Sequence, residues 1–124
     1  MLVVAACGND QAITASPPQD PGLVAGTVSA YVARPSITVR NGTEFQVGFV
    51  LVEPGLPMAA VFPPCVSNCA TLKPGAGVVV PYSSIVGHTD KSGAATMFWW
   101  RYNVLADGTL QAFGALETRT LTLN

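Results

Sequence analysis

The stretch AATMFWWRYNV, at residues 94–104, is the longest and most aromatic run of strand-forming residues in the chain. Aromatic and β-branched side chains favour strands, in which successive side chains point to opposite faces. One face of this strand carries three aromatic side chains, which we expect to be core: Phe98, Trp100 and Tyr102. The other face mixes apolar side chains with a charge and an amide, and we expect it to be half exposed: Met97, Trp99, Arg101 and Asn103.

Shorter runs of the same kind fill the chain from residue 27 onward, with turn signals such as Asn41-Gly42 and Asp107-Gly108 between them. The predicted strands are 27–33, 36–41, 44–53, 58–62, 77–82, 94–104, 109–115 and 118–124, and prolines make 58–62 at best an edge strand. Seven or eight strands at intervals of roughly 8–12 residues are typical of a β-sandwich or barrel. We therefore predict an all-β fold, an antiparallel β-sandwich of about seven strands, whose architecture resembles the immunoglobulin-like sandwich. A small closed barrel is the alternative.

Composition limits the functional classes. The 124 residues suffice for one domain with one core. Charged residues make up only 10%, against about 25% in a typical soluble domain. The net charge is -1 and the six basic residues are scattered, so we expect no nucleic-acid partner. No apolar run approaches the roughly 18 residues that a membrane-spanning helix needs.

The N-terminal motif Val4-Ala5-Ala6-Cys7 resembles the lipobox of bacterial lipoproteins, in which an aliphatic residue and two small residues precede a cysteine. In that family the signal peptide is removed and the cysteine thiol is lipidated. The resemblance implies that residues 1–6 are the remnant of a signal peptide and that Cys7 anchors the chain to a membrane. It places the protein in the bacterial cell envelope, on the periplasmic face of the outer membrane or on the cell surface.

The motif departs from a complete signal, which has a basic segment and an apolar segment of about 7–15 residues. No Lys or Arg precedes Cys7, and only Leu2 to Ala6 could be apolar segment. The alternative is that Leu2 to Ala6 form a short edge strand and that Cys7 is a buried thiol. The following residues favour the anchor, because 8–26 have no periodicity and are rich in Pro, Gly, Asp and Gln. We expect residues 7–26 to be a lipid-anchored flexible tether and residues 27–124 to be the sandwich domain.

The pair Cys65 and Cys69 is expected to form a local disulfide, since the protein is predicted to be exported. This pairing leaves Cys7 over, as a lipid acceptor should be. The alternatives are free thiols or a metal site that adds His88. A structural zinc site usually needs four ligands, so we predict no metal and no cofactor.

The segment 83–91 contains Ser83, Ser84, His88 and Asp90, the residue types of a hydrolytic triad. No G-x-S-x-G elbow surrounds a serine, and polar residues are expected in a surface loop anyway. We therefore predict that the protein is not an enzyme. A small periplasmic hydrolase with its site in this loop is the alternative.

Trp99 and Arg101 lie on the face expected to be half exposed, so they form a candidate platform for a sugar ring or a peptide. The alternative is a cation–π pair that shields the sheet. Taken together, the sequence predicts a non-enzymatic structural or binding module whose partner is an envelope protein or a glycan. A subunit whose edge strands pair with another protein is a further alternative.

Overall fold

The computed structural model describes residues 20–56 and 70–123. Its elements are seven strands and one short 3-10 helix: β1 (Val28–Ala33), β2 (Ser36–Asn41), β3 (Gln46–Val52), β4 (Ala70–Leu72), β5 (Gly77–Pro81), η2 (Tyr82–Ser84), β6 (Ala94–Val104) and β7 (Leu110–Thr122). The predicted all-β fold is confirmed. The predicted edge strand 58–62 lies outside the described residues.

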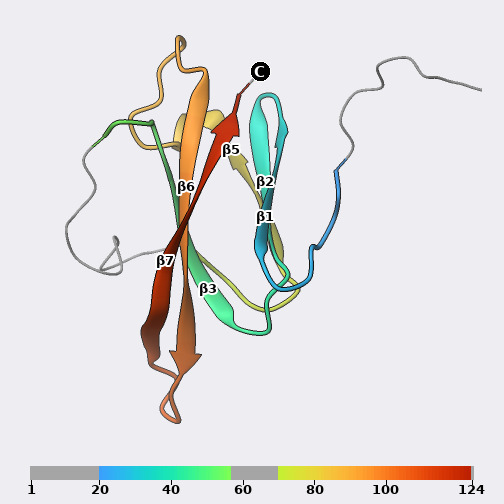
Figure 1. Ribbon diagram of the computed structural model, residues 1–124, viewed down its shortest axis with the longest axis vertical. Helices are drawn as coiled ribbons and strands as arrows, with labels where there is room; N and C mark the ends of the chain where they lie inside the picture. Colours follow the sequence, from blue (N-terminus) through green and yellow to red (C-terminus); the bar gives the residue numbers. More distant parts are fainter. Residues whose placement is uncertain (1–19, 57–69, 124) are drawn as a thin grey trace, which may run out of the picture.

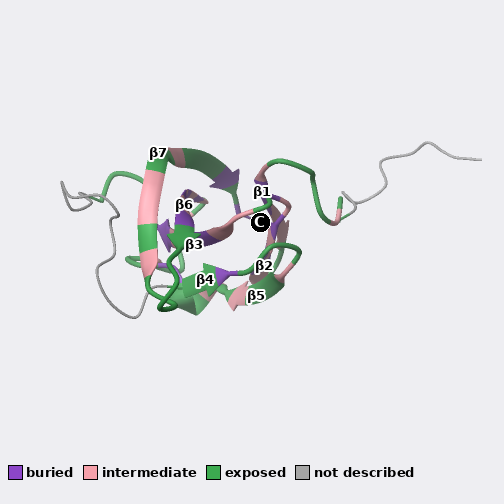
Figure 2. Cartoon of the chain, turned by 90° about the horizontal axis from the view of Figure 1, so that it is seen from below, coloured by how far each residue is buried: buried purple, intermediate pink, exposed green. Residues whose placement is uncertain are grey.

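The strands form two antiparallel sheets that face each other (Figures 1 and 2). The smaller sheet has the order β1-β2-β5 and the larger has the order β4-β3-β6-β7. The chain crosses from one sheet to the other three times, after β2, β4 and β5, while β1–β2 and β6–β7 are hairpins. This arrangement is the predicted antiparallel β-sandwich, with its core between the two sheets.

The last strand differs from the prediction. The runs predicted as 109–115 and 118–124 form one long strand, β7, paired with β6 throughout. Trp99 pairs with Glu117 but Arg101 pairs with Phe113, so β7 contains extra residues opposite Trp100. Gly114 lies there with a φ of +76°, a conformation that glycine adopts without steric cost. The predicted break is therefore an irregularity within a strand, and not a turn between two strands.

Our prediction of which face of β6 points into the core was wrong. Met97 and Trp99, which we expected to be half exposed, belong to the central cluster between the sheets and are 0% and 5% exposed. They pair with Leu51 and Phe49 of β3, which point to the same interior. Further core residues from both sheets pack around them: Val28, Ile37, Val39, Val47, Leu72, Ile85, Ala95, Leu121 and Leu123.

The opposite face of β6 is buried only in part and lies outside that central cluster: Trp100 and Tyr102 are buried as predicted, whereas Phe98 is half-buried. Trp100 is 0% exposed and makes an edge-to-face contact with Tyr102, with ring centroids 6.2 Å apart. Its partner residue on β3 is Gly48, and a Cβ atom added there would lie 2.5 Å from the Trp100 indole. The indole therefore occupies the space that any other side chain on β3 would fill at this position.

Replacing Gly48 by Ala should destabilise the protein by about 1–3 kcal/mol, because the added methyl would displace the indole of Trp100. The matched control is Gly93→Ala, since nothing lies within 4 Å of the Cβ position there. The free energy of unfolding, measured by urea titration, should fall for Gly48→Ala and not for Gly93→Ala. Equal stability of the two variants would contradict the packing described for Trp100.

Asn41 is a fully buried polar residue whose side chain is completely hydrogen-bonded. Its Nδ2 donates to the carbonyl oxygens of Phe45 and Leu72, at 2.7 and 3.0 Å. Its Oδ1 accepts from the amide and the hydroxyl of Thr43, at 2.9 and 2.7 Å. Its backbone amide donates to the carbonyl of Ala76 and its backbone carbonyl accepts from the amide of Gly75, just before β5. One residue thus links the end of β2 to the segments that begin or end β3, β4 and β5.

Changing Asn41 to Asp should destabilise the protein by about 3 kcal/mol or more at neutral pH, because a buried carboxylate would face two carbonyl oxygens. Asn103→Asp provides the control, since Asn103 is exposed at the end of β6. The midpoints of urea unfolding should separate the two variants clearly. A small and equal effect at both positions would show that the Asn41 amide does not hold these strands.

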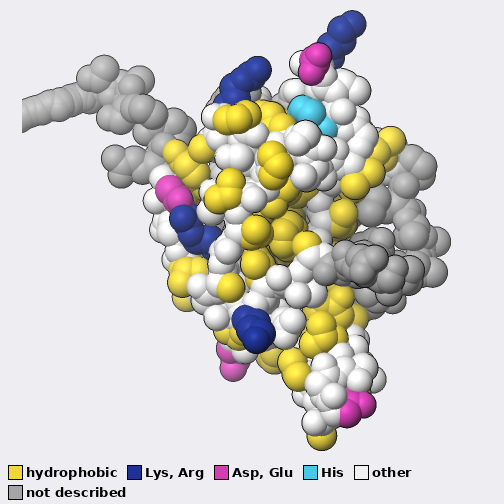
Figure 3. Space-filling view, turned by 180° about the vertical axis from the view of Figure 1, so that it is seen from behind, with side chains coloured by type: hydrophobic (Ala, Val, Ile, Leu, Met, Phe, Trp, Pro, Cys, Tyr) yellow, Lys and Arg dark blue, Asp and Glu magenta, His cyan; other side chains and the backbone are white. Residues whose placement is uncertain are grey.

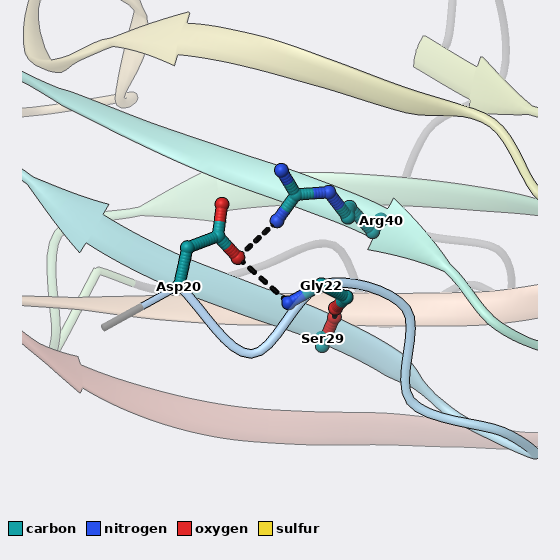
Figure 4. Close-up of polar contacts among 4 residues, drawn as sticks. All are labelled: Asp20, Gly22, Ser29 and Arg40. Carbon is teal, nitrogen blue, oxygen red and sulfur yellow. Dashed lines mark hydrogen bonds and ion pairs between the residues drawn. The ribbon is translucent and has the colours of Figure 1, made fainter. Parts of the chain in front are cut away.

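The chain from Asp20 to Gly26 lies against the outer face of the smaller sheet, although we assigned these residues to the tether (Figures 1 and 4). Asp20 forms an ion pair with Arg40 of β2, and the Ser29 hydroxyl of β1 donates to the Gly22 carbonyl at 3.3 Å. The amide of Gly26 donates to the carbonyl of Gly42 at 2.9 Å. The packed part of the chain therefore begins at least as early as Asp20.

The ion pair also changes the titration of Asp20. The hydrogen bond from Arg40, with that from the Gly22 amide, lowers the pKa of Asp20 below its usual 3.8. Because the folded-state pKa is the lower one, the contact contributes stability above that usual value and loses it as the pH falls through the lowered pKa.

Candidate functional site

Three segments that are distant in sequence enclose a pocket of about 250 Å³ at one end of the sandwich. They are the turn between β1 and β2, the start of η2 and the loop before β6. In Figure 1 these segments lie at the upper end of the molecule. The lining residues are Arg34, Pro35, Tyr82, His88, Asp90 and Ser92.

Backbone hydrogen bonds hold these segments together. The amide of Tyr82 donates to the carbonyl of Pro35 at 2.9 Å, which joins η2 to the β1–β2 turn. The amide of Ile85 then donates to the carbonyl of Tyr82 at 3.0 Å. Because the Ile85 side chain is 2% exposed and belongs to the core cluster, it fixes the loop to the sandwich. The segment from Tyr82 to Ile85 is therefore held to the β1–β2 turn by a hydrogen bond and to the core by the side chain of Ile85.

The loop that carries His88 is tied to the end of β3. The amide of Val86 donates to the carbonyl of Leu51 at 3.0 Å, and the amide of Glu53 donates to the carbonyl of Val86 at 2.8 Å. The amide of His88 in turn donates to the carbonyl of Ile85 at 3.1 Å. These bonds position the imidazole beside Tyr82, with the two ring centroids 5.5 Å apart and the rings tilted by 59°.

The far side of the pocket is a closed turn. The amide of Ser92 donates to the carbonyl of Thr89 at 3.0 Å, and the amide of Thr89 donates to the Ser92 hydroxyl at 2.9 Å. The Thr89 hydroxyl accepts from the amide of Lys91 at 3.3 Å. This turn carries Asp90 and Ser92, which both line the pocket.

Two of the residues that line the pocket carry a buried polar atom without a hydrogen-bond partner in the described part of the chain. The hydroxyl of Tyr82 and Nδ1 of His88 are both buried, and neither has a hydrogen-bond partner there. A buried polar atom without a partner costs about 1–3 kcal/mol. The rim also carries one cation, Arg34, and one anion, Asp90. The lining thus combines two aromatic residues with side chains of opposite charge, and the two unpaired polar atoms lie beneath its surface.

The structure brings together only part of the group that we singled out in 83–91. His88 and Asp90 both line the pocket, whereas Ser83 and Ser84 are exposed and do not line it. The serine that does line it is Ser92, just beyond that segment. Arg34 and Tyr82 were missed, because the sequence carries no signal that the β1–β2 turn and η2 meet.

Trp99 and Arg101 do not form the expected open platform. Trp99 is 5% exposed, and the guanidinium carbon of Arg101 lies 4.7 Å from the centroid of its ring. Arg101 also pairs with Glu117 at 3.3 Å. The geometry is that of the alternative, a cation–π pair at the edge of the core. The face of the indole that a ligand would need is occupied.

Other predicted features lie outside the described residues, namely Cys7, Cys65, Cys69 and the residues 1–19. His88 is described, but it belongs to no cluster of metal-ligating side chains within residues 20–56 and 70–123. Over the same ranges, the structure contains no helix with the length and apolar character needed to span a membrane.

Comparisons with protein-family models, with curated proteins and with solved structures find no match to this chain.

Proposed function

We propose that this chain is a lipid-anchored, non-enzymatic binding module of the bacterial envelope, and that its pocket binds a single sugar residue of an envelope glycan. The observation that carries the proposal is the pairing of Tyr82 and His88, two aromatic side chains with buried polar atoms that the described residues leave unpartnered. Both atoms are inaccessible to solvent, so the proposal requires the two lining side chains to turn toward the ligand, and the hydrogen bonds gained would then remove the cost of burying these atoms.

The chemistry of the rim favours a neutral, hydroxyl-rich ligand. Arg34 and Asp90 carry opposite charges, so their sum attracts neither an anion nor a cation. A sugar hydroxyl both donates and accepts, and so it suits a carboxylate, a phenol and an imidazole alike. The rings of Tyr82 and His88 add apolar surface for the C–H faces of a sugar.

The size of the pocket limits the ligand to about one ring. Pockets for drug-sized molecules hold about 300–1,000 Å³, and this one holds about 250 Å³. A terminal sugar residue of a longer glycan fits such a volume, since the rest of the glycan can remain outside. The recognised unit is therefore the end of a chain and not its middle.

The test is a titration of the full chain, carrying Cys7→Ser for solubility, with the peptidoglycan disaccharide and with simple hexoses. Calorimetry should detect binding, and Tyr82→Phe should weaken it by about 3–10-fold, because that change removes one hydrogen-bonding group and keeps the ring. Thermal unfolding without ligand should not weaken in Tyr82→Phe, since the hydroxyl has no partner among the described residues. Ser83→Ala, outside the pocket, should bind as the parent does.

Two results would contradict the proposal. One is the absence of saccharide binding, or binding that Tyr82→Phe leaves unchanged. The other is turnover of hydrolase substrates that disappears with His88→Ala, because this would show an enzyme with its site in the loop 83–91.

The proposed anchor rests on the resemblance of Val4-Ala5-Ala6-Cys7 to a lipobox. Because the packed part of the chain begins by Asp20, the proposed tether is restricted to residues 7–19. The same proposal includes two further points. The chain is not an enzyme, and Cys65 and Cys69 form a disulfide. An exported chain would oxidise that pair and leave Cys7 for lipidation.

Intact-mass measurement tests the anchor. The gene would be expressed in a bacterium with a complete signal peptide ahead of Val4-Ala5-Ala6-Cys7, alongside a Cys7→Ser control. We expect a species that begins at Cys7 and carries acyl chains, with Cys65 and Cys69 oxidised, and no such species from the control. An unprocessed chain with three free thiols would overturn both the anchor and the location.

A further inference from the structure

The strand β5 is an unusually unprotected edge. Within the described residues it pairs with β2 on one side and with no strand on the other. Its sequence, GVVVP, carries no charge, and Val78 and Val79 are 38% and 62% exposed. The strand lies at the back of Figure 1 and so faces the viewer in Figure 3, where hydrophobic side chains gather near the middle of that face. Proteins usually protect such an edge with charges or by covering it.

The register with β2 determines which backbone groups of β5 point outward. The amide of Asn41 donates to Ala76, and the amide of Tyr82 donates to Pro35, so the even-numbered residues from 76 to 82 bond to β2. In an antiparallel pair the residues between them direct their amide and carbonyl groups away from that partner. The outward groups are therefore those of Gly77 and Val79, and the carbonyl of Pro81.

These outward groups are complementary to themselves. If a second copy lies antiparallel with a two-fold axis at Val78, Gly77 faces the partner's Val79 and Val79 faces the partner's Gly77. Each of these pairs exchanges two hydrogen bonds, so all the outward amide and carbonyl groups of Gly77 and Val79 are satisfied. The contact is isologous and closes, which limits it to two copies.

Neighbouring registers are less favourable. A shift of the axis to Val79 places Pro81 at a hydrogen-bonding position, where it has no amide hydrogen to donate. A shift to Gly77 requires the amide of Gly75, which already donates to the carbonyl of Asn41 at 2.9 Å. The axis at Val78 is thus the register in which no donor is missing or already used.

The side chains fit the same register. Val78 would meet the partner's Val78 directly, as a close pair without hydrogen bonds. Val79, the most exposed valine of the strand, would cover the partner's Gly77, which has no side chain to obstruct it. The Cγ atom of Arg40 lies 3.1 Å from the Cβ position at Gly77, so the methylenes of Arg40 would pack on the incoming valine.

We propose that β5 is a homodimerisation edge, at which a second copy of this chain pairs antiparallel about a two-fold axis at Val78. The two smaller sheets then form one continuous six-stranded sheet. This inference does not depend on the ligand of the pocket or on the lipid anchor, because it rests on the exposure, the register and the hydrogen-bond positions of β5.

Sedimentation equilibrium of the full chain carrying Cys7→Ser tests the association. We expect a monomer–dimer equilibrium, and Val79→Lys should weaken the dimer by at least about tenfold, because a charge on an edge strand opposes pairing. Val104→Lys is the matched control, since Val104 is 59% exposed at the end of β6 and should leave the equilibrium unchanged. A chain that stays monomeric at millimolar concentration, or a dimer that Val79→Lys leaves intact, would overturn the proposal.

Cysteine crosslinking tests the register. Val78→Cys should form a disulfide-linked dimer on mild oxidation, because directly opposed residues have Cβ atoms about 4.5–5.5 Å apart. Val79→Cys should crosslink much more slowly, because the two Val79 positions are diagonal, at about 7–8 Å. Mass spectrometry of the digested dimer identifies the linked residue. Faster crosslinking through residue 79, or equal rates at both positions, would contradict the axis at Val78.

Discussion

The buried amide of Asn41 is the interaction on which the rest of the sandwich depends. Apolar burial drives the two sheets together, but it is non-directional and does not specify which residues face each other. The four side-chain hydrogen bonds of Asn41 do specify this, because they join β2 of one sheet to the segments around β3 and β4 of the other. Its backbone bonds to Gly75 and Ala76 set where β5 begins. At this end of the sandwich, the positions of β2, β3, β4 and β5 relative to one another are therefore set by Asn41.

Most strands could be predicted because alternation and turn signals are local properties of a sequence. Which face of a strand meets the other sheet is not local, and the residues of β6 show why. Trp99 and Trp100 are equally apolar, and Gly48 on the neighbouring strand allows Trp100 to be buried on the outer side. The three residues of β4 are too few to show alternation, and the single strand β7 depends on the left-handed conformation of Gly114.

The candidate site could be predicted only in part, for a related reason. The polar segment 83–91 contains His88 and Asp90, whose residue types are visible in the sequence. Arg34 and Tyr82 belong to the same pocket because Tyr82 donates to the carbonyl of Pro35 across the sheet. Such a contact joins residues that are far apart along the chain. The residue types therefore identified the loop 83–91 as a candidate site. Only the tertiary structure showed that Arg34 and Tyr82 line the same pocket.

The contacts of the segment from Asp20 to Gly26 would have a mechanical consequence if the chain is attached to a membrane, as we propose. Tension that reaches the sandwich from its N-terminal side loads the Asp20–Arg40 ion pair first, then the bond between Gly22 and Ser29, and then the bond between Gly26 and Gly42. These contacts would open in series, before any strand is pulled. The released segment of about six residues can span at most roughly 20 Å when fully extended. With the proposed anchor, the segment would extend before the folded domain bears the load.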